Sequence, residues 1–106
     1  MLPTLVYTHE ACLLHDAGEG HPERAARIEA AVRGARRWGG EIDLRTAPLA
    51  TEYELALVHD PAYIDEIARV CAAGGGVLDA DTAVVAGSWE AALRAVGAGL
   101  AAANAI

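Results

Sequence analysis

The stretch Cys12–Arg27, CLLHDAGEGHPERAAR, has the residues of a polar loop followed by those of a helix start. It holds two histidines, two glycines one residue apart, a proline and two arginines. Proline suits the first turn of a helix, and an acid such as Glu23 suits the positive end of the helix dipole. We therefore expect a loop from His15 to His21 and a helix that begins at Pro22.

The residues after this stretch continue the helical pattern. Apolar side chains recur with the spacing of one buried stripe, at Ala25, Ile28, Val32 and Ala35. Arginines gather in the last turns, and Gly39 with Gly40 ends the pattern. The sequence predicts one amphipathic helix up to about residue 38.

The same loop raises the question of a metal or phosphate site. The loop contains residue types that bind metals, namely His15, Asp16, Glu19 and His21. Their spacing matches no closed zinc pattern, and the only other close pair of such residues is His59 with Asp60. The glycines lack the third glycine of a dinucleotide fingerprint, and the acidic first turn would repel phosphate. Asp79 and Asp81 likewise lack the frame of a calcium loop. We expect no metal ligand in this chain, and no local signature marks a nucleophilic serine or cysteine.

Upstream, the alternating, β-branched residues 4–8 predict a strand. Downstream, residues 41–47 predict a second strand, with Ile42 and Leu44 on one face. Thr51 and Glu54 have the spacing of a capping box, which predicts a short helix after Thr51.

A further helix is expected from Asp60, as N-cap, to Gly74. Its predicted buried side consists of Tyr63, Ile64, Ile67, Val70 and Cys71. The glycine- and aspartate-rich residues 74–87 are expected to form a long loop. Ser88 is expected to cap a last helix that runs to the end of the chain.

Strands that alternate with helices predict a single α/β domain with a parallel sheet over residues 1–106. Two strands are few for such a sheet, whose faces both need cover. The last helix is apolar nearly all round and ends at Ile106 without a stop signal. We expect more sequence or a partner chain to cover it, and its uncharged run of about a dozen residues is too short for a membrane span.

The charge balance narrows the range of partners. Fifteen acids face eight basic residues, all of them arginine, which gives a formal charge of −7. No basic stripe typical of nucleic-acid binding is expected, whereas an acidic surface suits solubility or a cationic substrate. Two distant cysteines and an N-terminus without a basic leader predict a reduced, cytoplasmic setting.

Four segments in order resemble a known family: Cys12–Arg27, LALVHDPAYIDEI, GGGVLDADT and GSWEAALRAVGAGLAA. Together they resemble the N-terminal part of bacterial histone-deacetylase-like amidohydrolases, the group with acetylpolyamine amidohydrolases and acetoin-utilisation proteins. The resemblance implies a three-layer arginase/deacetylase fold with a parallel sheet, incomplete in this chain. It also implies a zinc enzyme that hydrolyses acetyl amides on lysine or polyamines.

The resemblance assigns no catalytic residue and no metal ligand to this chain, because the family's paired histidines and D-x-H zinc motif are absent past Ser88. It places His21 and Pro22 at the rim of the substrate pocket and Arg24 and Arg27 along an inner channel. Asp79 is the implied rim aspartate, with Asp81 as its competitor. The chain alone is expected to be inactive. The alternative function is a non-catalytic module of the same fold that forms a homo-oligomer through its apolar last helix.

Overall fold

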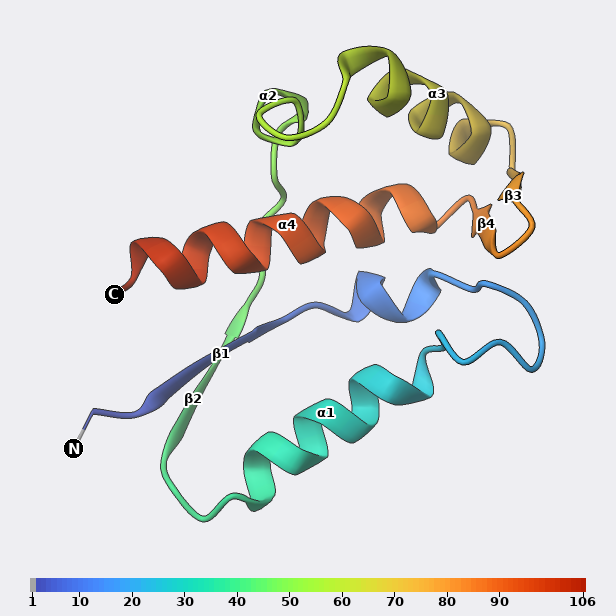
Figure 1. Cartoon of the computed structure of the whole chain (residues 1–106). Coiled ribbons are helices and arrows are strands. Elements are labelled where there is room, and N and C mark those ends of the chain that lie inside the picture. The colour runs from blue at the N-terminus through green and yellow to red at the C-terminus, as the bar shows by residue number, and fades with distance from the viewer. Residues whose placement is uncertain (1) are drawn as a thin grey trace.

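The computed structural model describes residues 2–106, whose elements follow one another as two β-α units, a β-hairpin and a final helix (Figure 1). Nine elements are present among these residues: β1 (Thr4–Thr8), the 3-10 helix η1 (Glu10–Leu14), α1 (Ala26–Arg37), β2 (Ile42–Thr46), α2 (Glu52–Leu55), α3 (Pro61–Ala72), β3 (Gly75–Asp79), β4 (Thr82–Val85) and α4 (Ser88–Asn104).

The strands β1 and β2 pair in parallel, from Thr4 opposite Ile42 to Thr8 opposite Thr46. The backbone N–H of Ala47 extends the pairing by donating to the Thr8 carbonyl at 2.8 Å. In Figure 1 this pair runs between α4 and α1, and α1 is the crossover that parallel strands require. The predicted parallel sheet and both of its strands are confirmed.

Helix α4 is fixed across the segment that follows β2. The Ala50 N–H donates to the Leu93 carbonyl at 3.0 Å, and Arg94 Nη1 donates to the Ala47 carbonyl at 3.0 Å. Gly97 is buried, and a Cβ there would collide with the Pro48 carbonyl. A glycine in mid-helix therefore allows α4 and residues 47–50 to approach closely.

The core is small and built from short side chains. Its buried apolar members are Ala11, Ala47, Ala50, Leu55, Ile64, Cys71 and Ala91. They lie where α4 meets η1, the segment after β2, and α3. The expected stripe of α1 faces inward but is only half-buried, because that helix leaves hollows between itself and its neighbours.

Several predicted boundaries are confirmed. Thr51 and Glu54 form both bonds of a capping box, and the Asp60 carboxylate accepts from the Ala62 N–H at 2.8 Å ahead of Pro61. Gly39, with a φ of 89°, follows the end of α1 as expected.

Two helix starts differ from prediction. Helix α1 begins at Ala26, four residues after Pro22, because the His21 ring binds the Glu23 amide and holds residues 21–24 in a turn. Helix α4 has Gly87, not Ser88, at its N-cap, because the Ser88 hydroxyl accepts from the Val85 N–H at 2.9 Å instead.

Two further predictions are wrong. The expected long loop contains the antiparallel hairpin β3–β4, whose register shifts between Val77 and Asp79. Glycines in β3 masked the strand signal of Val77 and Leu78. Tyr63 was expected on the buried side of α3 but is 53% exposed, because its ring lies beside that of His59 on the outer surface.

Within residues 2–106, no helix is both long enough and apolar enough to cross a membrane.

Candidate functional site

The loop between η1 and α1, residues 15–25, folds back on itself through local bonds. The Asp16 carboxylate accepts from the Gly18 N–H at 2.9 Å, and the His21 N–H donates to the Gly18 carbonyl at 3.2 Å. Gly18 and Gly20 have φ values of 116° and 76°, a region that side chains disfavour. The two glycines are therefore part of the turn geometry.

His21 joins this loop to the tip of the β3–β4 hairpin. Its Nδ1 accepts from the Glu23 N–H at 3.0 Å, which leaves the hydrogen of a neutral ring on Nε2. Nε2 lies 3.2 Å from the Asp81 carboxylate and 3.3 Å from the Asp81 carbonyl. Every polar atom of the ring thus has a partner, and the two segments are held together at the molecular surface.

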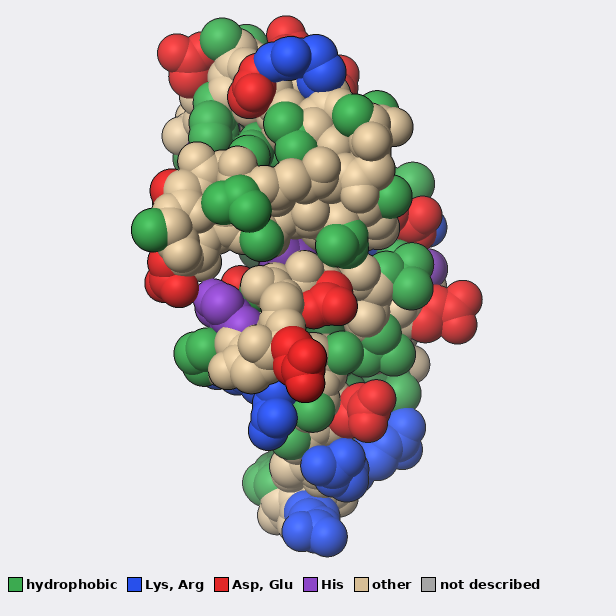
Figure 2. Space-filling view, turned by 90° about the vertical axis from the view of Figure 1, so that its right-hand side faces the viewer, with side chains coloured by type: hydrophobic (Ala, Val, Ile, Leu, Met, Phe, Trp, Pro, Cys, Tyr) green, Lys and Arg blue, Asp and Glu red, His purple; other side chains and the backbone are tan. Residues whose placement is uncertain are grey.

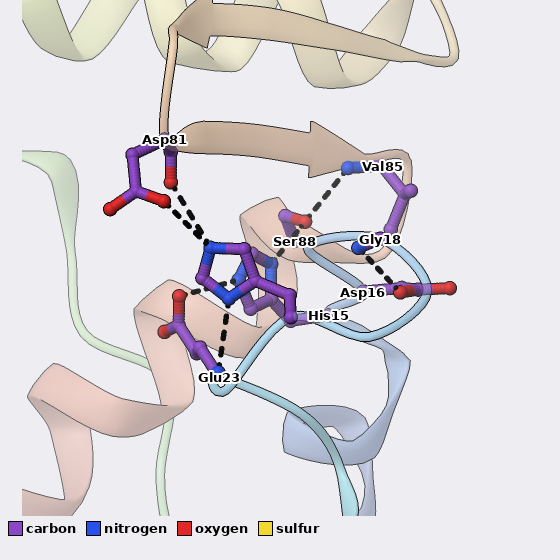
Figure 3. Close-up of polar contacts among 8 residues, drawn as sticks. His15, Asp16, Gly18, Glu23, Asp81, Val85 and Ser88 are labelled. Carbon is purple, nitrogen blue, oxygen red and sulfur yellow. Dashed lines mark hydrogen bonds and ion pairs between the residues drawn. The ribbon is translucent and has the colours of Figure 1, made fainter.

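His15 connects the start of the same loop to the start of α4 (Figure 3). Its Nδ1 lies 2.7 Å from the Ser88 hydroxyl, and its Nε2 lies 3.6 Å from the Glu23 carboxylate. Because Ser88 Oγ accepts from the Val85 N–H, its own hydrogen is available for His15 Nδ1. The imidazole then presents Nε2–H to Glu23, so Ser88, His15 and Glu23 form a chain of polar contacts.

This polar chain lies at one wall of a cavity of about 470 Å³. Small apolar residues of α4 and Ile28 of α1 line much of the rest, and Tyr7, Thr8 and Arg94 add further polar groups. The sulfur of Cys12 lies 3.9 Å from the Ala91 carbonyl nearby. A second hollow of about 310 Å³ shares His15 and Glu23 with it and extends to Arg24 and Arg27. An apolar cavity with a few polar groups at one wall has the character of a ligand site.

The tip of the hairpin carries Asp79 and Asp81. The Asp79 carboxylate accepts from the Asp81 N–H at 2.9 Å, and this bond, with a second from the Thr82 hydroxyl, lowers the pKa of Asp79. Asp79 therefore fixes the turn, while the largely exposed Asp81 carboxylate meets His21.

Comparison with known proteins shows the family of this chain. A sequence model of the histone deacetylase domain matches residues 21–106, which is most of the chain. The chain belongs to the histone deacetylase family.

Individual relatives agree with this assignment. An uncharacterized protein of Synechocystis sp. is 33% identical over 101 residues, which cover 91% of this chain and 33% of that protein. A histone deacetylase-like amidohydrolase of Pseudomonas aeruginosa is 28% identical over 123 residues, covering 97% of this chain and 32% of its own length. The chain thus spans about a third of the length of the curated relatives it matches.

The fold agrees as well. The crystal structure of the HDA15 HD domain superposes with a TM-score of 0.74 at 25% identity, over 91% of this chain and 30% of that one. The arginase/deacetylase fold implied by the sequence is therefore confirmed for the part of a histone deacetylase that this chain represents, an N-terminal segment of the family's domain.

The structure brings together some of the residues that the family resemblance singles out. His21 and Asp79 lie on the two segments that the Asp81 contact joins, and Pro22 is exposed beside His21. Arg24 and Arg27 are exposed side chains that line the second hollow. Their roles at a rim and along a channel stay predictions.

The zinc that the histone deacetylase family implies does not fit these residues. Within residues 2–106, no three His, Cys, Asp or Glu side chains are grouped so that they could hold a metal ion. His15 and His21 are each engaged with protein partners, and both contact Glu23. The chain's own residues therefore support no step through a metal.

The contacts of His15 with Ser88 and of His21 with Asp81 were not predicted from the sequence. Each joins residues far apart in the chain, 73 and 60 positions respectively. No local pattern reports such pairs. The one local signal is the lone serine of the sequence, directly after Gly87, and that pattern indicates only a helix cap.

Proposed function

We propose that this chain forms the pocket rim and part of the inner channel of a zinc-dependent deacetylase that hydrolyses acetyl amides on lysine or polyamines. The observation that carries the proposal is the match to the histone deacetylase domain over residues 21–106. The loop that His21 ties to the hairpin supports it, because a pocket rim needs segments held in fixed relation.

In this proposal His21, Pro22 and Asp79 border the substrate entrance. Asp79 is the better candidate for the rim aspartate, because the bond from the Asp81 N–H orients its carboxylate and the lowered pKa keeps it ionised. Asp81 is occupied by His21. A carboxylate at the entrance suits the amide N–H groups of a peptide or the ammonium groups of a polyamine.

Arg24 and Arg27 are proposed to line the inner channel, since both border the hollow that adjoins the larger cavity. Guanidinium groups present planar donors that fit a carboxylate such as a released acetate. Zinc chemistry in this class supplies a polarised carbonyl and a nucleophilic water. Because residues 2–106 offer no cluster of three or more His, Cys, Asp or Glu side chains that could hold a metal ion, the chain alone is proposed to be inactive.

The proposal is tested first with the purified chain. We expect no zinc bound at stoichiometric levels and no deacetylation of an acetyl-lysine peptide or an acetylated polyamine above a blank without protein. Stoichiometric zinc together with turnover would contradict the proposed inactivity.

A chimera tests the proposed contribution to the pocket. This chain would replace the matching third of the Pseudomonas aeruginosa relative, and a folded chimera is expected to deacetylate an acetyl-lysine substrate. Arg24→Ala in the chimera should lower turnover, while Arg36→Ala on the far part of α1 should leave it unchanged. A folded chimera that Arg24→Ala does not affect would contradict the channel role.

A cytoplasmic setting is also proposed. It is supported by two cysteines that both remain free thiols, with Cys71 buried and Cys12 partly so.

A further inference from the structure

The end of α1 carries three arginines without partners. Arg33, Arg36 and Arg37 are exposed and form neither an ion pair nor a side-chain hydrogen bond with any residue of the described range 2–106. The arginines of the other elements are all paired with acids: Arg45 with Asp43, Arg69 with Glu66 and Arg94 with Glu90. We call the three unpaired side chains the basic end.

A surface of opposite character covers α2 and α3. Residues 52–66 contain five acids and no arginine, and Glu52, Asp60 and Asp65 are exposed there. The one arginine of α3, Arg69, pairs with Glu66. Large apolar side chains lie exposed among them: Tyr53 at 75%, Leu57 at 65%, Val58 at 81% and Tyr63 at 53%. We call this surface of acids and apolar side chains the acidic face.

The two surfaces lie at opposite ends of the molecule. Figure 1 places α1 at the bottom and α2 with α3 at the top, with β1 and α4 between them. Figure 2 shows arginine side chains gathered at the lower end. The chain extends 45 Å along its longest axis, so one molecule cannot bring its own basic end to its own acidic face.

We propose that the acidic face binds the basic end of a second copy of this chain, in a head-to-tail contact. Guanidinium groups match carboxylates in bidentate pairs and stack on tyrosine rings, and the acidic face offers both. Because the two surfaces differ, a pair of copies leaves one surface of each kind free, and further copies add to it to form open chains.

The charge balance favours a second copy over nucleic acid. Outside residues 24–37 the chain has 14 acids and three arginines, so most of its surface repels a polyanion. A second copy, in contrast, presents an acidic face directly.

Sedimentation velocity of the full chain tests the proposal at low and high salt. Exposed charge pairs act over about 30 Å at 0.01 M salt and about 3 Å at 1 M. We expect the average mass to rise with protein concentration at about 0.01 M salt and to fall to that of a monomer at about 1 M. Association unchanged at high salt would overturn the proposal and assign the contact to an apolar surface such as that of α4.

Charge reversal distinguishes the two surfaces. Arg33→Glu with Arg37→Glu, and separately Glu52→Lys with Asp65→Lys, should each abolish association, and all four together should restore it. The matched control is Asp16→Lys with Glu19→Lys, which changes the net charge as the acidic-face variant does but leaves both surfaces intact. Loss of association in the control, or no restoration in the fourfold variant, would overturn the proposal. So would a monomer at low salt that binds a DNA duplex through Arg33 and Arg37.

Discussion

The Nε2 atom of His21 lies 3.2 Å from the carboxylate of Asp81, although the two residues are 60 positions apart in the chain. This contact joins the loop before α1 to the hairpin β3–β4, the two segments proposed as opposite parts of one pocket rim. No long buried side chain fixes either segment, because the buried residues of this chain are few and small. The position of the rim therefore depends on this surface contact together with the His15–Ser88 contact.

Removing the Asp81 carboxylate should loosen the loop without unfolding the chain. Asp81→Ala is expected to speed tryptic cleavage after the exposed Arg24 by up to about fivefold, because an exposed polar contact to a carboxylate contributes up to about 1 kcal/mol. Asp65→Ala, an exposed acid on α3, is the matched control and should leave the cleavage rate unchanged. Equal cleavage rates in both variants would contradict the contact's role.

The Ser88 hydroxyl is the buried hub between His15 and the Val85 amide, so its loss should lower stability. Ser88→Ala is expected to reduce the free energy of unfolding by about 1 to 3 kcal/mol, because it leaves the Val85 N–H donor and the His15 Nδ1 acceptor without their partner. Chemical denaturation measures this. In a double-mutant cycle with His15→Phe, a coupling of about 0.5 kcal/mol or more is expected. Additive effects would show that the His15–Ser88 contact is not stabilising.

Local sequence patterns predicted the elements with clear punctuation. The capping box at Thr51, the N-cap at Asp60 and the glycine after α1 were all found where the sequence places them. Each of these signals depends on residues within four positions of one another, so a single sequence is sufficient to read it.

Sequence patterns predicted the wrong structure where a distant or competing hydrogen-bond partner determines it. Pro22 and Glu23 have the composition of a helix start, but the His21 ring takes the Glu23 amide and delays the helix to Ala26. Ser88 is a residue type typical of a helix N-cap, but its hydroxyl accepts from the Val85 N–H and donates to His15 Nδ1. The same long-range contacts that define the candidate site are those that no local pattern contains.

The pKa of Asp79 makes stability depend on pH in the acid range. Because bonds from the Asp81 N–H and the Thr82 hydroxyl lower this pKa below its ordinary value of 3.8, the ionised form stabilises the folded chain. The contribution is complete above pH 3.8 and is lost as the pH falls through the lowered value. The melting temperature should fall between about pH 5 and about pH 2, and Asp79→Asn should make this fall smaller. An unchanged decline in Asp79→Asn would assign it to other carboxylates.

Two glycines of α4 should respond to alanine in opposite directions. A Cβ at Gly97 would meet the Pro48 carbonyl, whereas a Cβ at Gly99 meets no atom within 4 Å. Gly97→Ala is therefore expected to cost about 1 to 3 kcal/mol of unfolding free energy, because α4 must move away from the segment after β2. Gly99→Ala should stabilise by up to about 1 kcal/mol, because alanine is the better helix former. Urea denaturation of both variants measures the difference, and equal shifts would mean that α4 does not rest on Pro48 in solution.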